Sequence, residues 1–102
     1  MQQLKVKELK EFIILKSLEK EKKRFSEIRN DTNLYDYVIC KVLRRLESKK
    51  LIVRFVDINA RPPTVCYQIT NEGLKALKEY QLSLLQLLKL NDKAREKVLE
   101  LL

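Results

Sequence analysis

The sequence predicts a single α+β domain in which three helices are followed by a two-stranded antiparallel hairpin and a long last helix. Three observations indicate this fold class. Apolar residues recur at intervals of three and four in residues 4–19, 36–49 and 74–90, which is the helical period. Two segments rich in β-branched and aromatic residues, 51–58 and 65–70, flank a stretch that holds both prolines of the chain. A length of 102 residues suits one hydrophobic core.

A charged connector and a turn separate the first three helices. Residues 20–24 read KEKKR and lead to a short helix predicted over residues 26–31. Phe25 followed by Ser26 has the pattern of an apolar residue before an N-cap, so we expect Ser26 to cap this helix. Small polar residues then fill positions 30–33 and compete with helical backbone bonds, which predicts a turn made without glycine.

The third helix, over residues 36–49, is strongly amphipathic. Its apolar positions are Ile39, Val42, Leu43 and Leu46, at intervals of three and four. This spacing leaves a basic outer face, which we expect to contain Tyr37, Cys40, Lys41, Arg44 and Arg45.

The hairpin is predicted to carry an exposed tip stiffened by Pro62 and Pro63. Alternation along residues 65–70 places Val65, Tyr67 and Ile69 on one face of a two-stranded sheet, and Cys66, Gln68 and Thr70 on the other. We therefore expect Cys66 to be peripheral. We also expect Thr70 to cap the last helix from Asn71, although Gly73 stands where a capping box has a glutamate.

The last helix holds more leucine than one small core can cover. Residues 74–90 contain eight leucines, Asn91 and Asp92 then interrupt the pattern, and a short terminal helix is predicted after them. A helix that is apolar around most of its circumference requires cover on two sides, which a second copy of the chain would supply. We thus divide the chain into residues 1–73 and a C-terminal helical dimerisation extension, residues 74–102. Alternatively, the terminal helix folds back onto the monomer's own core.

Composition argues against several classes of protein. Histidine is absent and there is one glycine, so the usual general base and a phosphate-cradling glycine-rich loop are both missing. Cys40 and Cys66 lack the spacing of a metal site, and we expect two ordinary, semi-buried thiols. We predict no enzyme, no catalytic residue, no metal and no cofactor. The start of the chain resembles neither a signal peptide nor a membrane span, which predicts a cytoplasmic protein without a membrane partner.

The distribution of charge is more informative than the net charge of +8. Residues 1–70 carry a net charge of +7, whereas residues 71–102 carry only +1. An excess of this kind suits a polyanionic partner, although a basic composition alone also serves solubility. The basic excess therefore belongs to the first two-thirds of the chain.

Two stretches of the sequence resemble a known family. Residues 32–35 and 43–47, followed by Lys50-Leu51-Ile52, resemble the turn, recognition helix and first strand of MarR-like and PadR-like regulators and of related archaeal and archaeal-virus proteins. Residues 65–73 resemble the second strand and the start of the following helix, where these families have tyrosine, x, leucine-threonine, x, x, glycine. The resemblance covers residues 9–80 and implies a winged helix-turn-helix.

The sequence departs from the family pattern at three positions. Asn33 replaces the usual turn glycine, Tyr35 replaces the capping serine, and Lys50 replaces the glycine before the first strand. Because asparagine tolerates left-handed backbone, we expect the turn to survive. We expect Asp36 to act as the cap of the third helix.

The resemblance implies a sequence-specific DNA-binding transcription regulator that acts on double-stranded DNA as a homodimer, paired through its C-terminal helices and first helix. The recognition helix, residues 36–49, would enter the major groove, and the wing, residues 58–64, would lie on the flanking backbone or minor groove. Cations before the second helix would contact phosphate. The residues expected to bind DNA are Tyr35, Tyr37, Cys40, Lys41, Arg44, Arg45, Arg54, Arg61, Lys22, Lys23 and Arg24.

Two more modest interpretations remain beside this one. The cations of the third helix could form a solvated helix face, and Arg61 could be an exposed loop cation. Winged helices also serve as protein docking modules without DNA binding, and such modules lose the basic recognition face. Here the sequence keeps that face, so we rank docking second.

Overall fold

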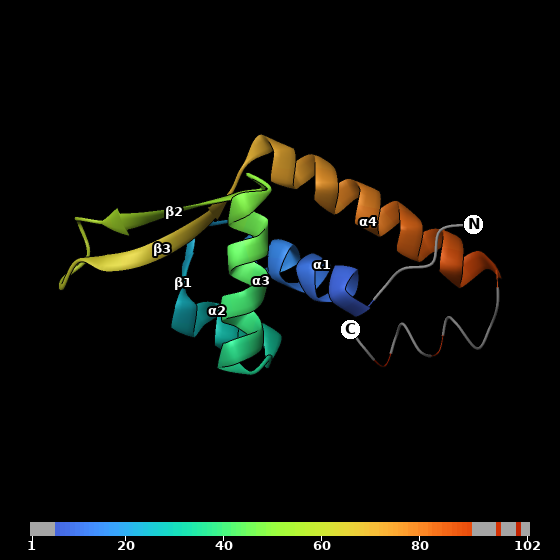
Figure 1. Cartoon of the computed structure of the whole chain (residues 1–102), viewed down its shortest axis with the longest axis horizontal. Coiled ribbons are helices and arrows are strands. Elements are labelled where there is room, and N and C mark those ends of the chain that lie inside the picture. Colours follow the sequence, from blue (N-terminus) through green and yellow to red (C-terminus); the bar gives the residue numbers. More distant parts are fainter. Residues whose placement is uncertain (1–5, 91–95, 97–99, 101–102) are drawn as a thin grey trace.

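The fold follows the predicted order of elements, with one additional strand (Figure 1). The structure is a computed structural model that describes residues 6–90 together with residues 96 and 100. The predicted break at Asn91 and Asp92 and the terminal helix lie outside the fully described part. The elements are α1 (Val6–Leu18), β1 (Lys23–Arg24), α2 (Phe25–Thr32), α3 (Asp36–Ser48), β2 (Ile52–Asp57), β3 (Thr64–Ile69) and α4 (Asn71–Leu90).

The helices enclose one core around α1. Ile14, Leu15 and Leu18 of α1 are completely buried, and α3 contributes its predicted apolar positions, of which Ile39 and Leu46 are also completely buried. From α4, Leu77 and Leu84 join the same core. The β2–β3 hairpin projects from this body on one side, while α4 runs along α1 and extends to the other (Figure 1). None of the described helices is long and apolar enough to cross a membrane.

The sheet has three antiparallel strands in the order β1-β3-β2. Residues 23 and 24, predicted as part of a connector, pair with Tyr67 and Cys66 of β3, so the prediction of a two-stranded sheet was one strand short. A two-residue strand made of Lys and Arg shows no alternation, which is why the sequence pattern did not reveal it. Across the hairpin, Arg54 pairs with Tyr67 and Phe55 with Cys66.

The extra strand also corrects the prediction for Cys66. Tyr67 and Ile69 face the core as expected, and Cys66 lies on the opposite face of β3. However, Cys66 is buried rather than peripheral, because β3 is the central strand and the larger Phe55 and Arg24 flank the small thiol in register. Cys40 is exposed, and both cysteines are free thiols.

Two helix starts differ from the predicted caps. α2 begins at Phe25, so Ser26 is not its N-cap; instead the Glu27 carboxylate accepts the backbone N–H of Arg24 at 3.0 Å. This bond satisfies the N–H of the residue that precedes the helix, and Ser26 lies inside the first turn. α3 has Tyr35 as its N-cap, without a side-chain cap, and Asp36 is inside the first turn. The prediction that Asp36 caps α3 was therefore wrong.

The join between α3 and β2 is a Schellman motif that contains lysine in place of glycine. Lys50 has φ 63° in the left-handed region, its N–H donates to Glu47 at 3.0 Å, and the Leu51 N–H donates to Leu46 at 2.9 Å. The Thr70 hydroxyl donates to the Lys50 carbonyl at 2.8 Å and accepts the Gly73 N–H at 3.0 Å, which confirms Thr70 as the cap of α4.

Gly73 is required by close packing rather than by its backbone angles. A Cβ at this position would lie 2.1 Å from the Leu51 carbonyl oxygen and 2.6 Å from a side-chain carbon of Ile69. That carbonyl also accepts the Thr70 N–H at 3.0 Å and has no room to shift. The first turn of α4 is therefore held directly against the chain that leaves α3.

Candidate nucleic-acid interface

The outer face of α3 carries the largest group of predicted site residues. Four of them are exposed: Tyr37, Cys40, Lys41 and Arg44. The last three follow Tyr37 by three, four and seven residues, so all four share one side of the helix. Within the described part of the chain, neither Lys41 nor Arg44 has a carboxylate partner. Two cations without partners on one exposed helix face are available to bind an anion.

Two tyrosines extend this face at the N-terminal end of α3. The rings of Tyr35 and Tyr37 are stacked with centroids 6.0 Å apart and planes 9° from parallel. Their exposed fractions are 74% and 65%, although tyrosine is on average intermediate between buried and exposed. The stack therefore presents flat apolar surface beside the cations of the same helix.

The turn between α2 and α3 is closed by backbone and side-chain hydrogen bonds. Asn33 adopts the expected left-handed conformation at φ 56°, and its N–H donates to the Arg29 carbonyl at 2.9 Å. The Arg29 guanidinium then donates to both oxygens of Asp36, at 2.6 and 3.0 Å. Asp36, displaced from its expected capping role, thus joins the first turn of α3 to α2 through an exposed ion pair.

Arg45, predicted on the outer face, lies instead at the edge of the core. Its Nε is 3.3 Å from Glu11 Oε1 of α1, and the Lys49 ammonium is 2.9 Å from the same oxygen. The Tyr80 hydroxyl of α4 donates to the other oxygen, Glu11 Oε2, at 2.6 Å. A side chain committed to a buried carboxylate does not contribute to the exposed cationic face.

Glu11 is the buried charge of the described chain, with an exposed fraction of 0%. Burial raises the pKa of this carboxyl, but hydrogen bonds from Tyr80, Lys49 and Arg45 outweigh burial and hold the pKa below its ordinary value. Burial and the bond to Glu11 raise the pKa of Tyr80 in turn. Four side chains from α1, the C-terminal end of α3 and α4 thus form one polar cluster, which we call the Glu11 cluster: Glu11, Arg45, Lys49 and Tyr80.

The sequence reasoning missed Glu11 and Tyr80. A usable signal was present, because Glu11 precedes Leu15 by four residues and Leu18 by seven and so lies on the buried line of α1. A carboxylate on such a line requires donors from neighbouring elements. Which elements supply them depends on tertiary packing, and the sequence does not encode that as a local pattern.

The three predicted phosphate contacts before α2 are each paired with a carboxylate. Lys22 Nζ is 3.5 Å from Asp57 and lies over the Phe55 ring, Lys23 pairs with Asp31, and the Arg24 Nε is 3.3 Å from Glu27. The bond from Lys23 lowers the pKa of Asp31. These three predicted phosphate contacts are therefore less available than Lys41 and Arg44.

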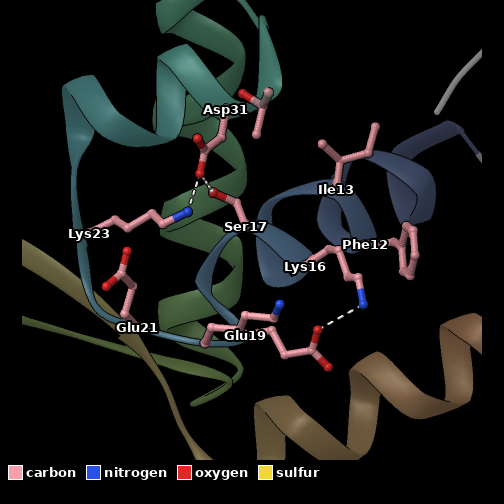
Figure 2. A pocket seen from close by; sticks show the side chains of 10 residues that line it. Phe12, Ile13, Lys16, Ser17, Glu19, Glu21, Lys23 and Asp31 are labelled. Atoms are coloured by element: carbon pink, nitrogen blue, oxygen red, sulfur yellow. Dashed lines mark hydrogen bonds and ion pairs between the residues drawn. The ribbon is translucent and has the colours of Figure 1, made fainter.

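A pocket of about 460 Å³ lies beside this group, between the end of α1 and α2 (Figure 2). Phe12 and Ile13 contribute apolar surface, and Figure 2 shows Lys23 and Ser17 pointing together at Asp31. The Ser17 hydroxyl donates to Asp31 at 3.1 Å. The charged groups in the pocket wall balance in sign, so the pocket favours neither an anionic nor a cationic ligand.

The wing places its two arginines in solvent. Arg54 on β2 and Arg61 at the hairpin tip are exposed, and neither has a carboxylate partner among the described residues. The tip is ordered by its own bonds, from the Asn59 N–H to Asp57 Oδ1 at 3.0 Å and from the Thr64 hydroxyl to the Pro62 carbonyl at 2.8 Å. Figure 1 shows this hairpin well clear of the helical body.

The leucines of α4 whose side chains the structure describes lie on two sides of the helix. Leu77 and Leu84 are buried against α1, whereas Leu74, Leu82 and Leu85 are exposed by 37%, 61% and 52%. The exposed leucines, eight and three residues apart, lie along one side of the helix. The core of one chain therefore covers part of the leucine-rich helix and leaves an apolar stripe outside, which we call the α4 stripe.

Three helices, of which the second and third are joined by a tight turn, together with a projecting antiparallel wing, define a winged helix-turn-helix. An exposed basic third helix is the feature that DNA-binding transcription regulators of this class use, and the protein is a regulator of that class rather than an enzyme. The chain belongs to the HxlR-like helix-turn-helix family, whose model matches residues 6–96.

Solved structures agree with this assignment. The HTH-type transcriptional regulator ytcD is 33% identical, with a TM-score of 0.58, over 72% of this chain and 74% of that one. Diamide-treated YodB from B. subtilis is 28% identical, with a TM-score of 0.61, over 72% and 76% of the two chains. A PadR family transcription regulator from Clostridium difficile R20291 shares the fold at 23% identity, with a TM-score of 0.76, over 82% and 95%. No curated protein sequence matches this chain.

Proposed function

We propose that this protein is a sequence-specific regulator that binds double-stranded DNA as a homodimer, with α3 in the major groove. The observation that carries the proposal is the pair Lys41 and Arg44, exposed and unpaired within the described chain on one face of α3. Arginine donates two parallel bonds to guanine O6 and N7, and tyrosine rings offer apolar contact to thymine methyl groups. Tyr37 and Arg44 are therefore the proposed base-reading residues, and Lys41 a phosphate contact.

The wing is proposed to contact the backbone or minor groove beside the site read by α3. Arg54 and Arg61 supply its positive charge. The paired cations Lys22, Lys23 and Arg24 are proposed as weaker phosphate contacts, because each would first have to leave a carboxylate.

The proposed dimer forms through the C-terminal extension, residues 74–102, together with α1. The α4 stripe supports this proposal, and the exposed Val6 at the start of α1 adds apolar surface. A two-fold dimer would present two copies of α3 to half-sites one helical turn apart, about 34 Å centre to centre.

The test is fluorescence anisotropy of a labelled duplex titrated with the protein at several salt concentrations. We expect binding that weakens steeply as salt rises, because phosphate neutralisation releases counterions. The variant Arg44→Glu should raise Kd by a factor of ten or more, since it removes a base contact and adds repulsion; one bidentate contact is worth about 1–3 kcal/mol.

A matched charge reversal serves as the control. Lys75 is exposed on α4, with its ammonium 3.6 Å from Glu72, and Lys75→Glu changes the net charge by the same amount. Because Lys75 lies in the extension proposed for dimerisation, light scattering first checks that this variant keeps the mass of the wild type. This variant should raise Kd only slightly. Equal losses from Arg44→Glu and Lys75→Glu would contradict the assigned geometry, and no binding by the wild type at low salt would contradict DNA binding itself. The protein docking interpretation would then take precedence.

A further inference from the structure

The Glu11 cluster joins the recognition helix to the helix proposed for dimerisation. Arg45 belongs to the last turn of α3, Lys49 follows that turn as the C-cap, and Tyr80 is in the middle of α4. All three donate to a single carboxylate on α1, at distances from 2.6 to 3.3 Å. The end of α3 and the centre of α4 are thus fixed to the same point.

A buried ion pair is by itself weak evidence for a stabilising role. Desolvating a carboxylate costs free energy that its partners largely recover, and apolar side chains of similar volume fill such a site at least as well. What the cluster supplies and an apolar contact does not is direction, because each hydrogen bond requires its donor in one place. The cluster therefore links the end of α3 and the middle of α4 through hydrogen bonds of defined direction to one carboxylate.

We infer that Glu11 is a positioning residue for sequence-specific DNA binding, which acts through Arg45, Lys49 and Tyr80 to set the recognition helix relative to the dimerisation helix. The inference rests on the proposed function. In a two-fold dimer the two copies of α3 must match two half-sites at once. A small rotation of α3 relative to α4 occurs in both subunits, so both rotations change the distance between the two recognition helices. Operator DNA therefore senses this angle, whereas scrambled DNA, bound through phosphate alone, does not.

Charge gives the inference a distinctive signature. Replacement of Glu11 by Gln keeps the shape of the side chain and releases Arg45 and Lys49 from their carboxylate. Both cations then become available to phosphate, so binding to scrambled DNA should stay the same or tighten while binding to the operator weakens. Tyr80→Phe removes one hydroxyl from the cluster without any change in charge, and Tyr80 lies on the side of α4 that faces the core, away from the α4 stripe.

The experiment begins with wild-type protein and a pool of random duplexes, from which the preferred operator is selected. Anisotropy then gives Kd for that operator and for a scrambled duplex with wild type, Glu11→Gln, Tyr80→Phe and the double variant. Ile28→Val, a completely buried position in α2, is the control for a modest loss of stability outside the Glu11 cluster. Thermal unfolding of each variant fixes a working temperature at which all are folded.

We expect Glu11→Gln to raise the operator Kd about tenfold and Tyr80→Phe somewhat less, with no rise for scrambled DNA. The double variant should match Glu11→Gln, because Tyr80 acts through Glu11. Ile28→Val should leave both Kd values unchanged.

The inference would be overturned if both cluster variants kept the wild-type ratio of operator Kd to scrambled Kd, whether neither Kd changed or both rose by the same factor. These outcomes would leave the DNA-binding proposal intact. A wild type that binds no duplex would remove the proposed function and the inference together, and that failure is visible before any variant is made.

Discussion

At the scale of single residues, Lys50 carries a conformational cost that the family pattern avoids. It occupies the position where related regulators have glycine, and it adopts a left-handed backbone conformation at φ 63°. For a residue with a Cβ this conformation costs about 1–2 kcal/mol. The two Schellman hydrogen bonds, to the Glu47 and Leu46 carbonyls, form only when Lys50 is left-handed, and they offset part of this cost.

Lys50→Gly should stabilise the protein. The released cost exceeds the extra entropy of glycine in the unfolded chain, so we expect a gain of roughly 0.5–1 kcal/mol. Urea denaturation followed by circular dichroism measures this change. Asn33→Gly is the control, since asparagine tolerates the left-handed region and should gain less. A Lys50→Gly protein no more stable than the wild type would show that the turn is not strained.

Glu11 should make stability depend on pH in acid. Its folded pKa lies below the ordinary value of 4.5, so the folded state resists protonation more than the unfolded state. The stabilising contribution is present above pH 4.5 and is lost as pH falls through the lowered folded pKa. In Glu11→Gln the free energy of unfolding should fall less steeply below pH 4.5 than in the wild type. Urea titrations at successive pH values test this, and identical slopes would refute the assignment.

At the scale of elements, the spacing of apolar residues predicted the helices and the two hairpin strands, and it missed the short strand β1, which has no apolar repeat. Residues 36–49 were predicted as the third helix, and α3 spans Asp36–Ser48; the hairpin also agrees to within a residue or two. β1 was missed because two charged residues carry no period. The same apolar spacing also predicted the exposed face of α3. It did not predict the position of the Arg45 side chain, which lies at the boundary of that face and turns toward the buried Glu11 carboxylate of α1.

The wing supplies a prediction that belongs to the hairpin as an element. Arg61 is exposed at its tip, so Arg61→Ala should weaken binding to operator and scrambled duplexes by a similar factor. Loss of one phosphate contact should reduce the slope of log Kd against log salt by about 0.9. Anisotropy across a salt series measures both effects. Asn59→Ala in the same loop is the control, and a loss confined to one sequence would mean that Arg61 reads bases instead.

At the scale of the whole molecule, one face of α4 completes the monomer and another remains exposed. Leu77 and Leu84 belong to the core, so part of the predicted extension already folds with the winged domain. The division at residue 73 is therefore a proposal about role, with α4 serving both the monomer core and the partner. Leu82 and Leu85, more than half exposed, represent apolar surface that water covers unfavourably.

The double variant Leu82→Glu/Leu85→Glu should convert a dimer into a monomer without unfolding it, because neither side chain contributes to the core. Light scattering gives the mass, and circular dichroism checks the fold. Operator affinity should fall much further than affinity for a single half-site, since one α3 then binds alone. Gln86→Glu/Glu79→Gln alters exposed positions outside the α4 stripe and should leave the mass unchanged. A wild type that scatters as a monomer would contradict the proposed dimer. A double variant that remains a dimer would locate the interface outside the α4 stripe, and the spacing of the operator half-sites would then not depend on these leucines.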